Sequence, residues 1–206
     1  MRQLQLKKLV PGIAVALLLA TSAWAAPVAF GGHYYDVIQA PTISWADARA
    51  AALTNTYLGL QGHLVTITSA GEDTAVKAMI QTNGGGEMWA GGYQDPSNPL
   101  SATSSTAGWT WVNGEGSFPG VDSTTPYADW NGGEPNDAYG PGSEQFLGLN
   151  LSGGGWNDEG NLALITGYVI EYDPNTINDV PEPAGLALVG MGLMGLAVTR
   201  RRQVSR

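Results

Sequence analysis

Residues 130–158 combine acids, amides and glycines, and they include no basic residue. The oxygen-bearing side chains in this stretch include Glu134, Asn136, Glu144, Asn157 and Asp158. Carboxylates held this close together repel one another, which raises their pKa values unless a cation lies between them. Glycine allows the backbone to take loop conformations that bring such side chains together. Because calcium takes about six to eight oxygen ligands, charged and neutral mixed, the stretch predicts a calcium site built on loops.

Two motifs in this stretch resemble the paired E-P-N and W-N-D motifs of the C-type lectin-like domain, namely Glu134-Pro135-Asn136 and Trp156-Asn157-Asp158. Further landmarks occur in the order typical of that family. The W-x-x-A-R-x-A pattern at 45–51 resembles its first helix, W-A-G-G at 89–92 its W-I-G-L strand, and W-T-W-V at 109–112 its W-x-W-V strand. The resemblance covers residues 34–172.

The resemblance implies an α+β C-type lectin-like fold, with two short helices, antiparallel sheets and long calcium-binding loops. It implies that the five side chains Glu134, Asn136, Glu144, Asn157 and Asp158 bind both calcium and sugar. In that family the bond before the proline of the E-P-N motif, here Pro135, is cis. A second calcium site of some relatives is not predicted, because Gln145 stands where an acid is usual, although Asp137 matches one ligand.

Local patterns predict the strands of such a domain. Aromatic and β-branched residues predict an opening strand at 34–38 and a second strand at 62–67. A closing strand is predicted at 167–172 and should pair with the opening strand, which places the two ends of the domain side by side. The segments 95–107 and 114–126 are predicted to be long loops, and long loops on a packed scaffold commonly carry function.

Two helix starts stand out. Ser44 precedes Asp47 by three residues in a capping-box-like arrangement, and Ser69 with Glu72 forms an S-x-x-E capping box. Helical spacing predicts that the second helix buries one apolar stripe, formed by Ala75, Val76, Met79 and Ile80. No further helical periodicity follows.

Trp109 and Trp111 alternate with Thr110, so both side chains point to the same face of a strand. Aromatic residues in a lectin-like chain invite a sugar-stacking role. Core packing is the preferred interpretation, because strand patterns must bury one face.

The N-terminal residues 1–25 are predicted to be a secretory signal peptide. Basic residues precede an apolar run at 9–20, and Ala23-Trp24-Ala25 offers a small-residue cleavage site. A membrane anchor is the alternative, but the run is shorter than the roughly 20 residues that a span needs. The predicted domain is then 26–173, followed by a polar spacer at 174–180.

The C-terminal residues 181–206 combine Pro181-Glu182-Pro183, an apolar segment at 184–198 and an arginine cluster. This arrangement resembles the PEP-CTERM sorting tail of Gram-negative bacteria that export polysaccharide. The resemblance implies transient anchoring in the inner membrane, exosortase processing near Pro-Glu-Pro, and delivery to the envelope or extracellular matrix. A plain C-terminal anchor with cytoplasmic arginines is the alternative.

The charge of the chain is uneven. All 18 acidic residues lie between Asp36 and Glu182, where Arg49 and Lys77 are the only bases, so this region has a net charge of −16. Such a field repels phosphate backbones and favours divalent cations, so we expect no nucleic-acid partner.

The chain has no cysteine, which excludes disulfides, thiol catalysis and zinc–thiolate sites. This departs from the lectin-like family, which usually carries two bridges. By alignment, Ala52 and Ile170 stand at the positions of one bridge, and Phe146 and Asn161 at those of the other.

The sequence therefore favours a secreted, calcium-dependent lectin without enzymatic activity. In the family, E-P-N implies mannose-, glucose- or fucose-type sugars. The alternative is a protein-interaction module in which calcium only stabilises the loops. A glycosidase pair formed by Glu134 and Glu144 is disfavoured, because a calcium-bound carboxylate stays ionised. The two histidines, His33 and His63, accompany no catalytic motif, and a structural role is predicted for His63.

Overall fold

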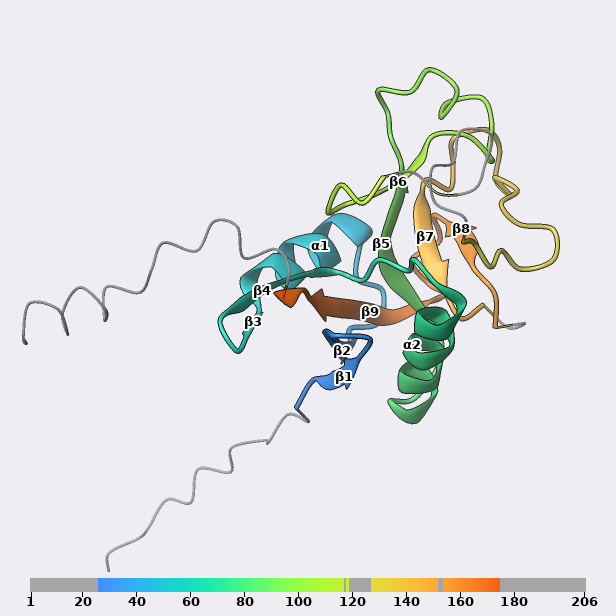
Figure 1. Cartoon of the computed structure of the whole chain (residues 1–206). Helices are drawn as coiled ribbons and strands as arrows, with labels where there is room; N and C mark the ends of the chain where they lie inside the picture. Colours follow the sequence, from blue (N-terminus) through green and yellow to red (C-terminus); the bar gives the residue numbers. More distant parts are fainter. Residues whose placement is uncertain (1–25, 117, 119–126, 152–153, 175–206) are drawn as a thin grey trace, which may run out of the picture.

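The structure is a computed structural model that describes residues 26–116, 118, 127–151 and 154–174. Two helices lie against a mixed β-sheet (Figure 1). The helices are α1 (Trp45–Thr54) and α2 (Ala70–Thr82), and the strands are β1 (Val28–Phe30), β2 (His33–Gln39), β3 (Thr56–Tyr57), β4 (Leu60–Leu64), β5 (Glu87–Gln94), β6 (Trp109–Trp111), β7 (Phe146–Leu149), β8 (Asn157–Glu159) and β9 (Ile165–Tyr172).

Strand β9 lies at the centre of the sheet because it has neighbours along both edges. On one edge it pairs antiparallel with β2, from Tyr34 opposite Tyr172 to Gln39 opposite Gly167. On the other edge its C-terminal half pairs with β4 and its N-terminal half with β5. The opening and closing strands are therefore adjacent, as the sequence predicts.

One strand pair departs from the expected antiparallel arrangement. Strands β5 and β9 run parallel, with Trp89 opposite Tyr168, whereas the other strand pairs among the described residues are antiparallel. Local sequence patterns could not predict this, because the two strands are separated by residues 95–164 and only the tertiary fold decides their relative direction.

Both helices begin at the predicted serines. The Ser44 hydroxyl accepts from the Asp47 amide at 3.1 Å, and the Ser69 hydroxyl accepts from the Glu72 amide at 3.3 Å. The second box differs in its return contact: the Glu72 carboxylate accepts from the Thr68 amide at 2.8 Å and from the Tyr35 hydroxyl at 2.7 Å. Glu72 therefore joins the start of α2 to β2 instead of closing the box on Ser69.

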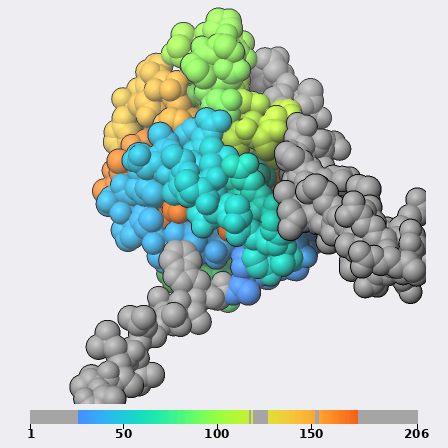
Figure 2. All heavy atoms as spheres, turned by 90° about the vertical axis from the view of Figure 1, so that its left-hand side faces the viewer, coloured from blue at the N-terminus to red at the C-terminus, as the bar shows by residue number. Residues whose placement is uncertain are grey.

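The two faces of the sheet carry separate apolar clusters. One contains the α2 stripe and the tryptophans predicted to be core, with Trp109 and Trp111 both buried. The other contains Trp45, Ala48 and Ala52 of α1 packed with alternate residues of β9. Figure 2 shows that α1 and the segment after it, in blue to cyan, cover this second face. The alternation of β9 residues between the clusters follows from the period of two of a strand.

Tight packing occupies one of the positions where the family carries a disulfide. Ala52 and Ile170 are both fully buried in the α1 cluster. A Cβ atom on Gly62 would lie only 2.7 Å from Cγ2 of Ile170 and 2.9 Å from the carbonyl oxygen of Ala52. Glycine at this position therefore lets β4 approach α1 and β9 closely.

Two smaller differences concern β4. The predicted second strand at 62–67 is observed as Leu60–Leu64. Val65 continues the pairing, since its amide donates to the Val169 carbonyl at 3.0 Å and its carbonyl accepts from the Gly91 amide at 2.7 Å. The short strand β3 that precedes it was not predicted, since two residues carry no periodic pattern.

The loops gather at one end of the molecule. The β5–β6 connection (green) and the segment leading to β7 (gold) extend beyond the sheet at the end opposite β1 and β2 (Figure 1). The predicted signal peptide, the spacer from 175 on, the sorting tail and most of the loop at 114–126 lie outside the described residues. Within the described residues, no helix has the length and apolar character to cross a membrane.

Candidate functional site

Strand β8 places Asn157 and Asp158 in the interior. Trp156, immediately before it, is fully buried, and its indole N–H donates to the Asp73 carboxylate of α2 at 2.7 Å. The strand itself pairs with β7, with Asn157 opposite Gly148 and Asp158 opposite Leu147. A buried aromatic anchor and a paired neighbour thus fix where these two polar side chains point.

The segment 127–145 is fastened to the same strand. The Asn131 amide donates to the Trp156 carbonyl at 2.8 Å, and the Trp156 amide donates to the Asp129 carbonyl at 2.7 Å. The peptide bond between Glu134 and Pro135 is cis, as the resemblance implies. These contacts bring the E-P-N motif beside W-N-D although about twenty residues separate them.

Asp158 is fully buried and holds the loop through backbone amides. Its carboxylate accepts from the amide of Asn136 at 2.9 Å and from that of Asp137 at 2.8 Å. The carboxyl group of Glu134 lies close enough to that of Asp158 for the charge of Asp158 to raise its pKa. The residues predicted from E-P-N and W-N-D are therefore in direct contact.

Glu144 reaches the same region through the longer loop that precedes it. One of its carboxylate oxygens accepts from the Ala138 amide at 2.5 Å. Asp137 closes this loop, since its carboxylate accepts from the amides of Gly142 at 3.0 Å and Glu144 at 3.1 Å. Asp137 is thus engaged in organising the loop.

Asn157 faces two acids that lie outside the predicted ligand set. Its side-chain amide donates to Glu87 of β5 at 3.1 Å and to Glu159 at 3.3 Å. Gly148 makes room for this arrangement, because a Cβ atom there would lie 2.3 Å from an oxygen of Glu87. We name Glu87, Glu134, Glu144, Asp158 and Glu159 the acidic cluster.

The acidic cluster is electrostatically unfavourable for ionised carboxylates. Burial raises the pKa of Glu134 to about 7, and the hydrogen bond and charge of Asp158 and the charge of Glu144 add to the shift. Burial also raises the pKa of Glu87 to about 7 against the opposing hydrogen bond from Asn157. Burial raises the pKa values of Glu144 and Asp158 as well. Each shift favours the neutral acid unless a positive charge is supplied.

Neither Lys77 nor Arg49, the two lysine or arginine residues that the structure describes, supplies that charge. Lys77 pairs with Asp73 at 2.6 Å and with Asp129 at 2.5 Å, and Arg49 lies over the Trp45 ring at 5.6 Å. Among the described residues, Oε2 of Glu134 is buried without a hydrogen-bond partner. A buried acceptor without a donor, surrounded by oxygen-only side chains, fits a hard divalent cation such as calcium.

The five predicted residues thus lie in one region, but with unequal exposure. Asn136 is exposed and Glu134 is half-buried, whereas Glu144, Asn157 and Asp158 are buried. The carboxylate oxygens of Glu134, Glu144 and Asp158 do not all lie within 4.8 Å of one another. Within the described residues, three ligand atoms of acids or histidines lie within 4.8 Å of one another only in His33, Glu171 and Asp173.

Glu87 and Glu159 were missed for different reasons. Glu159 directly follows W-N-D, so its position in the sequence could have indicated that it lies near Asn157. Glu87 belongs to another strand, and the pairing of β5 with β7 is what brings it to the cluster. Only tertiary contacts reveal a residue of that kind.

Comparisons with known proteins support the two resemblances. Residues 179–202 match the family described as the PEP-CTERM protein-sorting motif, which implies export and exosortase sorting in a Gram-negative bacterium. The chain is also similar to halomucin of Haloquadratum walsbyi, with 32% identity over 150 residues. That match covers 70% of this chain and spans only 1% of the length of halomucin.

The solved structures that are similar to this chain include the C-type lectin CEL-I from Cucumaria echinata. The two are 21% identical with a TM-score of 0.54, over 74% of this chain and 98% of CEL-I. A protein described as the EPNH mutant of CEL-I is 24% identical with a TM-score of 0.55, over 74% of this chain and 97% of that protein. Human lithostathine is 20% identical with a TM-score of 0.53, over 72% of this chain and 98% of lithostathine. Together with the fold above, these comparisons show that the chain has the C-type lectin-like fold and carries a PEP-CTERM sorting motif.

Proposed function

We propose that this protein is an exported, calcium-dependent carbohydrate-binding protein. The observation that carries the proposal is the acidic cluster: buried carboxylates from three segments converge where no basic side chain of the described residues balances them. Glu134, Asn136, Glu144, Asn157 and Asp158 are the proposed ligands, and Glu87 and Glu159 add negative charge behind them. Calcium, when bound, supplies positive charge and exchangeable coordination positions that suit sugar hydroxyls.

The protein's own groups divide the remaining work. The backbone contacts of Asp158 and Glu144 hold the loop in place. Glu134 ionises above a pH of about 7 and then offers two acceptor oxygens, one of them Oε2. The exposed Asn136 side chain offers an NH₂ donor and a carbonyl acceptor at the surface.

A sugar hydroxyl can donate to a carboxylate while it accepts from an amide NH₂, so Glu134 and Asn136 together match one hydroxyl. We assign mannose-, glucose- or fucose-type sugars on the E-P-N order. A single site of this type should bind weakly, on the order of 1 mM. Avidity would then depend on many copies or on a multivalent exopolysaccharide at the envelope or matrix.

A second candidate is a protein-interaction module in which calcium only stabilises the loops. The observation that favours it is Asn157, which is 7% exposed and whose amide hydrogens are directed to Glu87 and Glu159. An amide committed in this way is not presented to a sugar. Calcium binding would be retained in this case, and carbohydrate binding would be absent.

The deciding experiment is a glycan array probed with the full chain in calcium, in chelator and in chelator followed by excess calcium. We expect binding to mannose-type glycans that chelator removes and calcium restores. Asp129→Asn is the matched control, because Asp129 is an acid of the same segment whose partner is Lys77.

The outcomes separate the two candidates. A calcium-raised melting temperature with no signal on any glycan would favour the interaction module. Sugar binding that persists unchanged in chelator, or an Asp158→Asn variant that still binds calcium like Asp129→Asn, would refute the proposed ligand set.

A further inference from the structure

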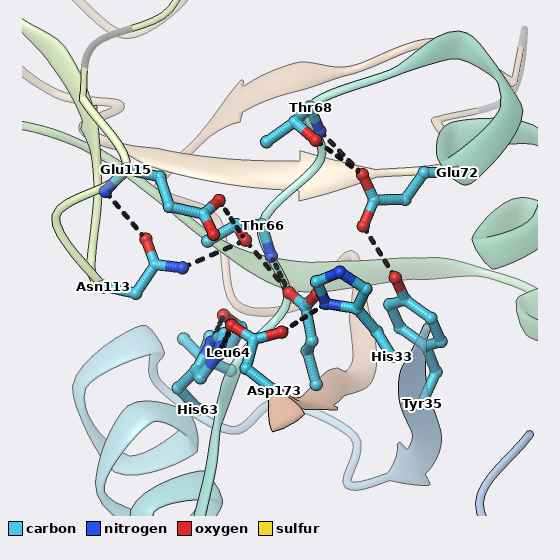
Figure 3. Close-up of polar contacts among 11 residues, drawn as sticks. His33, Tyr35, His63, Leu64, Thr66, Thr68, Glu72, Asn113, Glu115 and Asp173 are labelled. Carbon is cyan, nitrogen blue, oxygen red and sulfur yellow. Dashed lines mark hydrogen bonds and ion pairs between the residues drawn. The ribbon is translucent and has the colours of Figure 1, made fainter. Parts of the chain in front are cut away.

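The two histidines of the chain lie at the end of the domain where β2 begins and β9 ends. His33 is the first residue of β2, His63 lies in β4, and Glu171 and Asp173 lie at the end of β9 and just beyond it. We name these four residues the histidine cluster. Pairing of β2 and β4 with β9 brings the four residues together across about 140 residues of sequence. Figure 3 shows His33, His63 and Asp173 of this cluster.

His33 faces two carboxylates through one ring nitrogen. Its Nδ1 lies 2.8 Å from Oε1 of Glu171 and also contacts Oδ1 of Asp173. The ligand atoms of these three residues all lie within 4.8 Å of one another. The ligands of a tetrahedral ion with bonds of about 2.0–2.1 Å are about 3.3 Å apart, so small side-chain shifts suffice to surround one ion.

His63 holds Asp173 from the other side. Its Nε2 lies 3.1 Å from Oδ2 of Asp173, and its Nδ1 lies 2.9 Å from the Leu64 carbonyl. Both ring nitrogens of His63 therefore face oxygen atoms, and the contact at Nε2 orients Asp173. Oδ1 of Asp173 is thereby directed to His33.

Glu171 is oriented in a similar way. Its Oε2 accepts from the Thr66 amide at 2.9 Å, and the Thr66 hydroxyl lies 3.0 Å from the same oxygen. This leaves Oε1 directed to His33. Hydrogen bonds that fix the free oxygen of a ligating carboxylate are a regular feature of protein metal sites.

Burial and access also fit an ion. The side chains of Glu171 and Asp173 are 1% and 4% exposed, whereas His33 is 28% exposed and leaves a route from solvent. One imidazole nitrogen and two carboxylates suit zinc and other divalent first-row transition metals better than calcium, which prefers an all-oxygen shell.

We propose that His33, Glu171 and Asp173 form a second metal site, specific for zinc-class transition ions, with His63 as a positioning residue. The site is independent of the acidic cluster, because the residues of the two sets make no contact with one another among the interactions observed for the described residues. Zinc bound there would fasten the opening strand to the closing strand.

The test is titration of the full chain, purified without a histidine tag and freed of metal, with zinc sulfate by calorimetry. We expect about one zinc per chain that excess calcium does not displace. His33→Gln and Asp173→Asn should abolish this binding, and His63→Gln should weaken it about 10–100-fold. Asp158→Asn is the matched control in the acidic cluster and should bind zinc as the parent does.

A spectroscopic measurement distinguishes ligation from a structural role. Copper(II) bound to the parent should show nitrogen hyperfine coupling by electron paramagnetic resonance, and the coupling should persist in His63→Gln and disappear in His33→Gln. If the variants fail to fold, histidine-selective ¹⁵N labelling of the parent gives only two ring systems to follow. Zinc must then shift the His33 ring signals.

Three results would overturn the proposal: no zinc binding tighter than that of His33→Gln, copper without nitrogen coupling, or His33 signals that zinc leaves unmoved. In each case the histidine cluster is an ion-pair network alone. None of these results bears on calcium or sugar binding, so the two proposals fail separately.

Discussion

The acidic cluster and the histidine cluster differ in the distance along the chain from which they are assembled. Four of the five acids in the first cluster lie between residues 134 and 159. The second cluster draws on residues 33, 63, 171 and 173. The first is therefore visible as a dense local stretch, whereas the second exists only because β9 pairs with both β2 and β4.

The two clusters also differ in how their negative charge is balanced. In the histidine cluster, both imidazoles contact Asp173, whose pKa is lowered despite its burial, whereas burial raises the pKa of Glu171. In the acidic cluster, no basic side chain of residues 26–116, 118, 127–151 and 154–174 contacts the carboxylates, and burial raises the pKa values of Glu87 and Glu134 to about 7. The comparison teaches that, without metal, the carboxylates of the histidine cluster already face imidazoles, whereas those of the acidic cluster mainly face one another.

The largest expected effect is the loss of calcium binding in Asp158→Asn. Asp158 lies at the centre of the cluster and holds two loop amides, so removing its charge should lower calcium affinity by about 100-fold or more. Calorimetry against Asp129→Asn measures this. The same variants should show equal zinc affinity. If Asp158→Asn lost zinc binding together with calcium binding, the two clusters would not be independent metal sites.

Calcium should stabilise the parent at neutral pH. Calcium at about 100 times its dissociation constant is expected to add about 2.7 kcal/mol to the free energy of unfolding. Thermal melts with and without chelator at pH 8 check this. The gain should shrink at pH 5, because protons then occupy Glu87 and Glu134. An equal gain at both pH values would indicate that calcium acts elsewhere.

The pH dependence of the metal-free protein should separate the clusters. The carboxyl groups of Glu87 and Glu134 have pKa values of 4.5 unfolded and about 7 folded, so stability should fall as the pH rises from 4.5 to 7. The pKa of His33 is raised from 6.5 to about 9 by the Glu171 hydrogen bond, against burial. Its contribution is complete below pH 6.5 and is lost as the pH rises through 9.

Two variants assign these windows. In denaturant titrations at each pH, Glu87→Gln should reduce the decline between 4.5 and 7, and His33→Gln should reduce the decline between 6.5 and 9. The reverse pattern, or an effect of either variant in the other window, would contradict the assignment of charge balance to the two clusters.

Gly148→Ala should produce a smaller loss of calcium affinity, about tenfold. The new Cβ atom would displace the Glu87 carboxylate, the flexible end of a side chain, from its place beside Asn157. Gly132→Ala in the neighbouring loop is the control, since no atom lies within 4 Å of its Cβ position. Equal calcium affinity of the two variants would show that Glu87 does not contribute to calcium binding.

The smallest effect concerns sugar selectivity. Glu134→Gln combined with Asn136→Asp exchanges the donor and acceptor positions of the motif, and we expect a several-fold shift from mannose toward galactose. Competition on the glycan array measures it. A double variant that keeps the selectivity of the parent would show that these two side chains do not read the hydroxyl.

Much of the fold could be predicted because its signals are local. The Ser44 and Ser69 caps, the α2 stripe and the buried Trp109 and Trp111 follow from spacing alone. The parallel pairing of β5 with β9 could not be predicted, because strand direction depends on the path of the intervening chain. Glu87 could not be predicted for the same reason, because the pairing of β5 with β7 brings it to the acidic cluster.

The sequence by itself determined the local chemistry of this protein: an acidic stretch without bases, the E-P-N and W-N-D residues, and the Pro-Glu-Pro tail. Only the tertiary structure decided that Asn157 turns its amide to Glu87 and Glu159, and that His33 and His63 meet Asp173. The physical reason is that sequence spacing fixes the residues that share a face of one element. Which elements become neighbours is decided by the burial of apolar surface over the whole domain.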